Sequence, residues 1–456
     1  MRVLWLCNMM LPVIAGQLGL EASNKEGWLS GLLEILYQKK NENNLEIAVA
    51  FPAPEAFFQE KGETTKREIL YQGSSLICYG FREDTVHPER YDAGLEEQMK
   101  SILQDYDPDI VHGFGTEFPH TLAMCRVFPK KDKILLGIQG LCSVHAGAYF
   151  ANLPKSVIRK ATFRDLVKQD SLQKQYEKFV KRGEMELEAL KLAGNIAGRT
   201  EWDQYYTQKA NPDAHYFVLN ETLRGIFYEG TWDVKTCQKH RIFLSQGDYP
   251  LKGLHYMLKA LPKILENYPD ARLVVAGNSL TAYHTWKEKL KISGYGKYLR
   301  ELMQENHLEK QVLFVGKQDA EQMKRQYLMC HTFVCCSANE NSPNSLGEAM
   351  MLGVPCITTD VGGVPSIFTK DLDGIMVEGF RTKEDEFHRN GNSTKSDEEQ
   401  MECIADSLAS AVIRLWEWEE QVPGYCEHAR RHAMENHHRD RNYRQLLEVY
   451  SQIAGV

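Results

Sequence analysis

Short apolar segments rich in β-branched and aromatic residues recur along the first half of the chain, and longer segments with helical spacing separate them. The apolar segments predict strands over 3–7, 45–51, 75–79, 109–112, 134–138 and 195–198. The intervening stretches include "GWLSGLLEILYQKK" from Gly27 and the run 171–193, both with helical spacing. This alternation of strands and helices predicts a parallel, doubly wound sheet.

The pattern restarts in the second half, with strands predicted over 242–245, 272–276, 312–315, 332–336 and 356–358. We therefore expect an α/β fold of two Rossmann-like doubly wound parallel-sheet domains, over 1–216 and 217–425. Apolar and aromatic residues at helical spacing in 426–456 predict a helical tail that packs back towards the N-terminal domain. The polar segment 378–400 predicts a solvated surface excursion.

Length and composition limit the class of protein. A chain of 456 residues with 43% hydrophobic and 25% charged residues is typical of a globular protein with more than one domain. Its net charge of −8 argues against nucleic-acid binding. The eleven cysteines include no CxxC motif, and most lie in apolar runs, which favours buried thiols in a reducing cytoplasm. The apolar start of the chain, interrupted by Asn8 and Pro12, predicts a first strand rather than a signal peptide.

Two glutamates eight residues apart mark the candidate site, in "SANENSPNSLGEAMMLGVPCITTDVGGVPSIF" from Ser337. Asn344 and Ser345 suit the start of a helix, and Ser345 with Glu348 has the spacing of a capping box. Glu340 has no such role and lies in the loop after a predicted strand, beside a helix amino terminus that favours an anion. A carboxylate there is useful when it accepts hydrogen bonds from hydroxyl groups of the same ligand. A phosphate flanked by hydroxyl groups is a nucleotide sugar.

Other ligands fit the sequence less well. Lys252, in "SQGDYPLKGL", follows the first strand of the second half and could reach a diphosphate at the same sheet edge. The stretch "HGFGTEF" has Phe118 where a dinucleotide motif needs its third glycine, which disfavours NAD. The Asp-x-Asp pairs of "YDPDIVH" and "DLDGIMV" precede predicted strands and are interpreted as turns, so no metal ligands are assigned.

The second half resembles the carboxyl-terminal domain of a family 4 glycosyltransferase with the GT-B fold, in which two Rossmann-like domains face a cleft. The resemblance rests on Glu340 and Glu348 with "LGEAMMLGVPCITTDVGGVP", on the Lys-Gly of "PLKGL", and on "PDIVHGFGTE" and "IQGL". It implies a retaining, metal-independent transferase without a cofactor, whose donor is a nucleoside-diphosphate sugar, a UDP-sugar by preference. It also implies catalytic roles for Glu340 and Lys252. The donor-binding residues that it implies are Glu348, Asn344, Ser345, Leu346, Gly27, Gln139, Gln246 and Gly316.

The chain departs from the family pattern at several positions. Gln246 and Gly247 stand where an arginine is common, and Gln139 stands where many members have a histidine. Glu26 and Gly27 replace a glycine pair, and Ser366 replaces the glutamate of GGxPE. The departures indicate either a subgroup resembling bacterial capsule and polysaccharide enzymes or a protein with reduced activity.

We therefore interpret the chain as a hexosyl-type glycosyltransferase that moves a sugar to a hydroxyl group of a glycan or lipid-linked glycan acceptor. The alternatives are an NDP-sugar epimerase and a noncatalytic sugar-nucleotide-binding or scaffold protein. The window 151–182 has a net charge of +6 within a chain of −8, with apolar residues between the basic ones. This pattern predicts a peripheral contact with the inner face of an anionic membrane, and otherwise a cytoplasmic protein.

Overall fold

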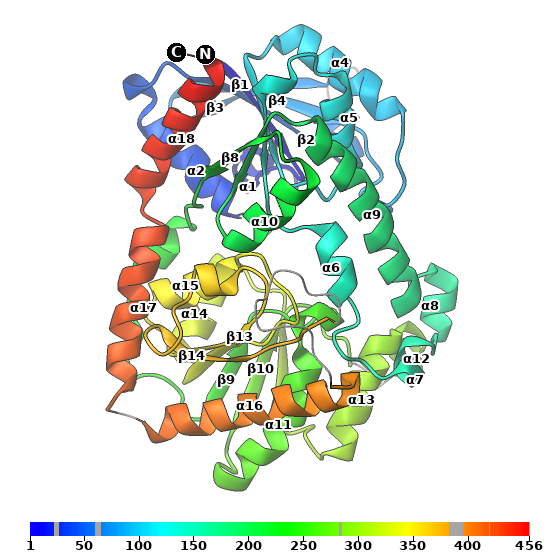
Figure 1. The fold of residues 1–456 in the computed structure, drawn as a ribbon, viewed down its shortest axis with the longest axis vertical. Coiled ribbons are helices and arrows are strands. Elements are labelled where there is room, and N and C mark those ends of the chain that lie inside the picture. Colours follow the sequence, from blue (N-terminus) through cyan, green and yellow to red (C-terminus); the bar gives the residue numbers. More distant parts are fainter. Residues whose placement is uncertain (22–26, 60–64, 282–284, 383–394, 419, 456) are drawn as a thin grey trace. The chain divides into compact units, whose positions relative to one another are not determined.

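The computed structural model describes residues 1–21, 27–59, 65–281, 285–382, 395–418 and 420–455 (Figure 1). These residues form two compact α/β units. Unit 1 contains Met1–Val144, Lys178–Arg224 and Asn436–Val456, and unit 2 contains His145–Glu177 and Gly225–Glu435. The segment His145–Glu177, which the sequence analysis placed in the first domain, thus clusters with the second.

Unit 1 is built on an eight-stranded sheet of order β3-β4-β2-β1-β5-β6-β7-β8. Its strands are β1 Arg2–Cys7, β2 Glu46–Pro52, β3 Lys66–Tyr71, β4 Ser74–Phe81, β5 Ile110–Phe114, β6 Ile134–Gly137, β7 Asn195–Gly198 and β8 His215–Val218. Six of them were predicted, whereas β3 and β8 were not. All neighbours are parallel except β3, which pairs with β4 in the antiparallel direction, so the expectation of a wholly parallel sheet is wrong at this edge.

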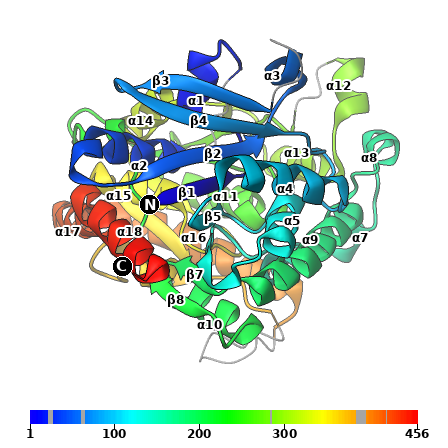
Figure 2. The same ribbon diagram turned by 90° about the horizontal axis from the view of Figure 1, so that it is seen from above.

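Helices cover both faces of this sheet, as Figure 2 shows for α2 and α18 on one face and α4 and α5 on the other. The helices of unit 1 include α1 Pro12–Gln17, α2 Gly27–Gln38, α3 Glu55–Gln59, α4 Gly94–Tyr106, α5 Pro119–Val127, α10 Glu201–Ala210 and α18 Arg439–Ala454. Two more helices, α6 Cys142–Ala148 and α9 Leu172–Leu192, begin or end in unit 2. The apolar face of α18, including Leu446 and Tyr450, lies in one core with Trp5 of β1 and Val49 of β2.

Unit 2 is built on a six-stranded sheet of order β11-β10-β9-β12-β13-β14, in which every pair is parallel. The strands are β9 Arg241–Leu244, β10 Arg272–Ala276, β11 Val312–Gly316, β12 Thr332–Cys335, β13 Cys356–Asp360 and β14 Gly374–Glu378. Four of these strands are buried along almost their whole length, as expected for a parallel sheet with helices on both faces. The doubly wound fold predicted for this half is confirmed.

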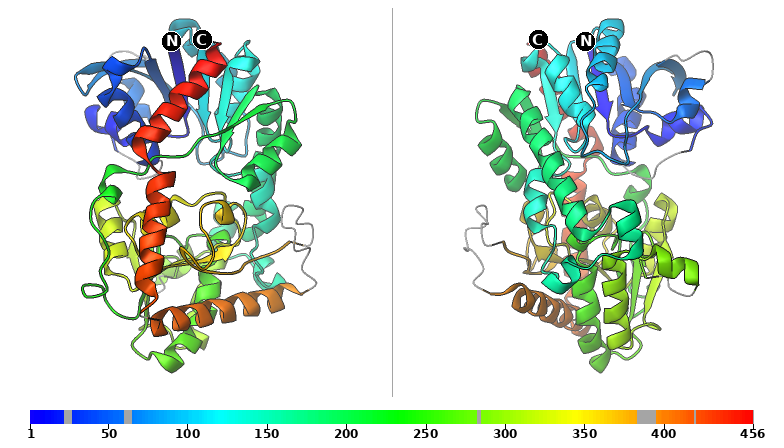
Figure 3. Two further views of the ribbon diagram at one scale, coloured as in Figure 1. Left: turned by 60° about the vertical axis from the view of Figure 1, so that its left-hand side comes forward. Right: turned by 90° about the vertical axis from the view of Figure 1, so that its right-hand side faces the viewer.

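The helices of unit 2 follow from their apolar spacing. In α11 Leu254–Asn267, the buried residues Leu254, Leu258 and Leu261 recur at helical spacing, and the helix packs on α13 Gly294–Glu305 and α16 Asp397–Glu417 (Figures 1 and 3). The other helices are α7 Lys155–Ile158, α8 Phe163–Lys168, α12 Trp286–Lys291, α14 Ala320–Met329, α15 Asn344–Met351 and α17 Val422–Asn436. None of the described helices is long and apolar enough to cross a bilayer.

The polar segment 378–400 is only partly described, because residues 383–394 lie outside the described residues. Its start differs from the expected solvated excursion. Arg381 is buried, and its guanidinium lies 2.9 Å from a carboxylate oxygen of Asp360 at the end of β13. The buried, paired guanidinium ties this part of the chain to the sheet.

Candidate functional site

The ends of three neighbouring strands bring the candidate residues of unit 2 together. β9, β12 and β13 lie side by side and run parallel, so the loops that follow them emerge at the same edge of the sheet. The loop after β9 carries Lys252, the loop after β12 carries Glu340, and the loop after β13 carries Gly362. Carboxyl ends of parallel strands are where open α/β sheets bind ligands.

Lys252 and Glu340 form an ion pair at this edge. The Lys252 Nζ lies 2.5 Å from Glu340 Oε1, and the Ser337 hydroxyl donates to the same oxygen at 2.7 Å. The two charged side chains are only 20% and 13% exposed, respectively. Burial by itself lowers the pKa of Lys252, but the attraction of Glu340 outweighs it, and the net shift of the pKa is upward. Lys252 is therefore a protonated ammonium held beside a carboxylate.

Two glycines allow these loops to approach so closely. Gly253 has a φ of +70°, and a Cβ there would lie 1.8 Å from the carbonyl oxygen of Cys336. Gly362 has a φ of +52°, and its Cβ would lie 1.9 Å from the carbonyl oxygen of Glu340. The backbone N–H of Gly363 donates to that same oxygen at 3.0 Å. Any other residue at either glycine would push the Glu340 loop away from its neighbours.

Glu348 lies inside α15 rather than at its start. The helix begins at Asn344 as predicted, but its N-cap is Pro343, so the predicted capping box between Ser345 and Glu348 is wrong. The fixed φ of Pro343 starts the helix too early for Ser345 to serve as the cap. Glu348 is buried, and its Oε2 lies 3.3 Å from the hydroxyl of Tyr327.

The remaining predicted donor residues are divided between the units. Asn344, Ser345 and Leu346 are the first three residues of α15. The N–H of Leu346 donates to the Pro343 carbonyl at 3.0 Å. Gln246 follows β9, and Gly316 ends β11 with a φ of +74°. Gly27 and Gln139 belong to unit 1, where Gly27 is the first residue of α2 and Gln139 follows β6. The donor roles of all these residues remain predictions.

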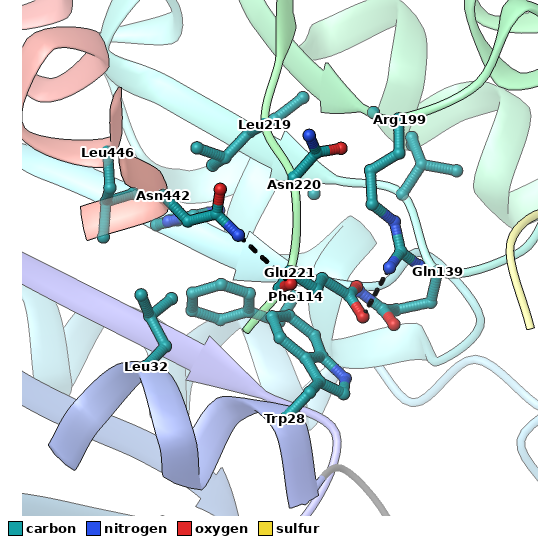
Figure 4. Close-up of a pocket in the computed structure, with 15 residues that line it drawn as sticks. Trp28, Leu32, Phe114, Gln139, Arg199, Leu219, Asn220, Glu221, Asn442 and Leu446 are labelled. Atoms are coloured by element: carbon teal, nitrogen blue, oxygen red, sulfur yellow. Dashed lines mark hydrogen bonds and ion pairs between the residues drawn. The ribbon is translucent and has the colours of Figure 1, made fainter. Parts of the chain in front are cut away.

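Unit 1 has a pocket of its own at the ends of β5, β6 and β7 (Figure 4). Trp28 and Phe114 form an aromatic wall with ring centroids 5.6 Å apart. Arg199 and Glu221, both buried side chains, form an ion pair of 2.7 Å, and Gln139 Nε2 donates to Glu221 at 2.9 Å. Other lining residues include Leu32, Leu219, Asn220, Asn442 and Leu446.

A chain of hydrogen bonds orients His112 in this pocket. Trp5 Nε1 donates to the Tyr450 hydroxyl at 2.9 Å, and that hydroxyl lies 2.8 Å from His112 Nδ1. The Tyr450 hydroxyl thus joins the Trp5 indole to the His112 ring. Burial lowers the pKa of His112 to about 3, so the ring is neutral. Among the described residues Nε2 has no hydrogen-bond partner.

Four lining residues of this pocket were not predicted as site residues, namely Trp28, His112, Arg199 and Glu221. Arg199 directly follows β7 in "NIAGRTE", so its place at a strand end was an available signal. Glu221 lies in an irregular segment with no motif, and its pairing with Arg199 depends on the tertiary fold. No sequence pattern indicated it.

The comparisons with known proteins agree with this geometry. Residues 234–406, which include Lys252, Glu340 and Glu348, match the family model described as "Glycosyl transferases group 1". Spore coat protein SA from Bacillus subtilis is 30% identical over 203 residues, which are 44% of this chain and 45% of that protein. A putative glycosyltransferase, YtcC, from the same organism is 29% identical over 170 residues, or 37% of this chain and 39% of that protein. The matched parts thus span less than half the length of these curated relatives.

Solved structures show the fold over the whole chain. Sucrose-phosphate synthase from Thermosynechococcus elongatus covers 99% of both chains, with a TM-score of 0.62 and 12% identity. HepE from Anabaena, solved in complex with UDP and glucose, covers 99% of this chain and 100% of its own, with a TM-score of 0.62 and 13% identity. The fold is GT-B, as predicted. Together, the domain match and the relatives support a place in the GT-B glycosyltransferase superfamily.

The approach of Gly362 to Glu340 can be tested by stability. We expect Gly362→Ala to lower the free energy of unfolding by about 3 kcal/mol. The alanine would have to adopt a left-handed backbone conformation, and its Cβ would clash with the Glu340 carbonyl oxygen. Gly19→Ala is the matched control, because Gly19 has a φ of +66° with no atom within 4 Å of its Cβ position. It should cost about 1–2 kcal/mol. Urea unfolding measures the free energy of unfolding of both variants. Equal losses in Gly362→Ala and Gly19→Ala would show that the Glu340 loop does not press on Gly362.

Proposed function

We propose that the protein is a retaining glycosyltransferase that moves a hexose from a UDP-sugar to a hydroxyl group of a glycan or lipid-linked glycan. The observation that carries the proposal is the Lys252–Glu340 pair, held at the ends of three parallel strands beside the start of α15. An ammonium, a carboxylate and helix N–H groups at one sheet edge provide partners for a diphosphate and for sugar hydroxyl groups.

Each residue has a distinct role in this proposal. Lys252 has three N–H donors, so it can keep its bond to Glu340 and still donate to a diphosphate oxygen. Glu340 accepts hydrogen bonds from donor-sugar hydroxyl groups, and the backbone from Asn344 to Leu346 faces the phosphate or sugar. Glu348 contacts the ribose. Gln246 offers a neutral donor where a second cation would otherwise stand, so one ammonium and the helix end stabilise the leaving group.

The proposed reaction needs no nucleophile from the protein. The bond between the anomeric carbon and the diphosphate oxygen breaks, and the acceptor oxygen forms the new bond on the same face of the sugar. The acceptor proton passes to an oxygen of the departing diphosphate, which leaves as UDP. Lys252 and the α15 N–H groups stabilise the negative charge that develops on that diphosphate.

The pocket of unit 1 supports a polyol as the acceptor. An aromatic wall suits the apolar face of a sugar ring, and the polar groups of Gln139, Glu221 and His112 line the same pocket. His112 presents the Nε2 atom of a neutral imidazole there, and Glu221 presents a carboxylate. The proposed final product is a bacterial polysaccharide.

We also propose that the protein works in a reducing cytoplasm, which the eleven free cysteines support.

Other proteins of this fold do different chemistry, so the assay must separate the alternatives. A putative UDP-N-acetylglucosamine 2-epimerase from Listeria monocytogenes aligns over 100% of this chain with a TM-score of 0.51 and 12% identity. Release of free UDP that depends on an acceptor indicates transfer. Interconversion of the sugar without UDP release indicates an epimerase, and binding without either product indicates a noncatalytic protein.

Glu340→Gln should lower the transfer rate by at least about 100-fold while the protein stays folded. Glutamine still accepts a hydrogen bond from Lys252 but loses the charge that strengthens bonds from sugar hydroxyl groups. Acceptor-dependent UDP release measures the rate, and circular dichroism measures the fold. Glu309→Gln, at an exposed glutamate outside the site, is the control and should be fully active. Wild-type turnover in Glu340→Gln would remove Glu340 from the proposed role.

Transfer should also continue after the protein has been dialysed against EDTA. Lys252 and the α15 N–H groups are proposed to stabilise the leaving diphosphate without a divalent ion. The same UDP-release assay with and without chelator tests this. If activity is lost in EDTA and restored by Mg²⁺ or Mn²⁺, the metal-independent mechanism is wrong.

A further inference from the structure

Two short helices of unit 2 expose large apolar side chains to solvent. They are α8 and α12, which come from distant parts of the sequence and contact each other. Their exposed apolar residues, 44–68% accessible, are Phe163, Leu166, Val167, Trp286 and Leu290, and we refer to these five as the apolar patch. Contiguous apolar groups on a protein surface mark interaction sites more often than scattered ones do.

Two hydrogen bonds connect α8 to the segment after α12. The Thr162 hydroxyl, at the start of α8, donates to the Ile292 carbonyl at 2.7 Å. The buried carboxylate of Asp165 accepts the backbone N–H of Gly294 at 2.8 Å. Figures 1 and 3 show α8 and α12 close together at one edge of the unit. The patch is therefore a fixed surface and not two independent loops.

Basic residues surround the patch. Helices α7, α8 and α12 and the residues that follow α7 carry exposed lysine and arginine side chains. These are Lys155, Arg159, Lys160, Lys168, Lys287, Lys289 and Lys291. The nearby acidic groups are already engaged. Asp165 and Asp170 pair with Arg164 at 3.1 and 2.9 Å, and Glu288 forms the capping box of α12 with Thr285. This surface is thus positive in a chain whose net charge is −8.

We propose that the apolar patch and its basic surround dock unit 2 on a membrane of anionic phospholipid. Apolar side chains can enter the interfacial region, where tryptophan is favoured, while the lysines remain at the level of the phosphate groups. The apolar patch and the basic residues together favour an anionic membrane over a protein or a nucleic acid. Protein interfaces are depleted of lysine, and nucleic-acid sites have no need of exposed leucine and valine. The docking is independent of the proposed transfer activity and would hold for a noncatalytic protein.

This surface differs from the one expected from sequence. The membrane contact expected from sequence involved the basic window 151–182. In the structure Val157 of that window is buried, and α12 contributes Trp286, Leu290 and three lysines. Arg164, a basic residue of that window, is held by two carboxylates. It is therefore left unchanged in the experiment below.

Sedimentation of the full chain with vesicles tests the proposal. We expect binding to vesicles of mixed phosphatidylcholine and phosphatidylglycerol at low salt, weaker binding as salt rises, and little binding to phosphatidylcholine alone. Equal recovery with both kinds of vesicle at low salt would overturn the proposal.

Two variants separate the charge from the apolar contribution. The charge variant is Lys160→Glu, Lys168→Glu and Lys291→Glu, and each lysine lost should weaken partitioning by about fivefold or more. Its control is Lys130→Glu, Lys235→Glu and Lys310→Glu, at exposed lysines outside the surface. The apolar variant is Phe163→Ser, Leu166→Ser and Trp286→Ser, and its control is Leu70→Ser, Val86→Ser and Leu372→Ser, at other exposed apolar residues. Unchanged binding in either patch variant, or an equal loss in its control, would overturn the proposal.

A second readout does not depend on multiple substitutions. Brominated phospholipid quenches a tryptophan that enters the bilayer, so quenching is expected in the wild-type protein and should be lost in Trp286→Phe. Trp286→Phe keeps an apolar ring and should still sediment with the anionic vesicles. The same quenching in Trp286→Phe as in the wild type would show that Trp286 is not the inserted residue and would contradict the proposed docking face.

Discussion

The close approach of three loops around Glu340 is the constraint on which the candidate site depends. Lys252 reaches Glu340 only because Gly253 lets the loop after β9 pass against Cys336, and Gly362 lets the loop after β13 press on the Glu340 backbone. The ammonium and carboxylate are largely withdrawn from water, so each needs the other. A ligand that supplies phosphate oxygens and hydroxyl groups would satisfy both charges at once. This is the physical reason for proposing a nucleotide sugar.

Unit 1 is organised by a different kind of contact. Helix α18 places Tyr450 between Trp5 of β1 and His112 of β5, and these hydrogen bonds orient the His112 ring. The same helix contributes Asn442 and Leu446 to the pocket wall. The end of the sequence is therefore part of the pocket of unit 1, and the chemistry offered there depends on how that helix packs.

Much of the fold could be predicted from the sequence, because buried parallel strands such as β1, β7 and β10 are short apolar runs between helices. Strand β3 was missed because "KREILY" lies at the sheet edge and is largely exposed, so half of its residues are charged and its apolar run has only three residues. Their positions after strands placed Glu340 and Lys252 at the same sheet edge, and the structure brings the two side chains into contact. Their roles in binding and catalysis stay predictions. The predicted capping box is wrong because Pro343, and not Ser345, is the N-cap of α15. The Arg199–Glu221 pair was missed because only the tertiary structure brings those two residues together.

The most direct test of the account is the affinity for UDP, measured by calorimetry in the wild-type protein and in Lys252→Met. A methionine keeps the length and apolar stem of lysine but removes the ammonium. The account predicts that UDP binds the wild type and that Lys252→Met raises Kd by at least about tenfold, as expected for the loss of a charge-assisted hydrogen bond. Lys310→Met, at an exposed lysine, should bind as the wild type does. Equal Kd values in Lys252→Met and the wild type would contradict the central claim that the Lys252–Glu340 edge holds the diphosphate.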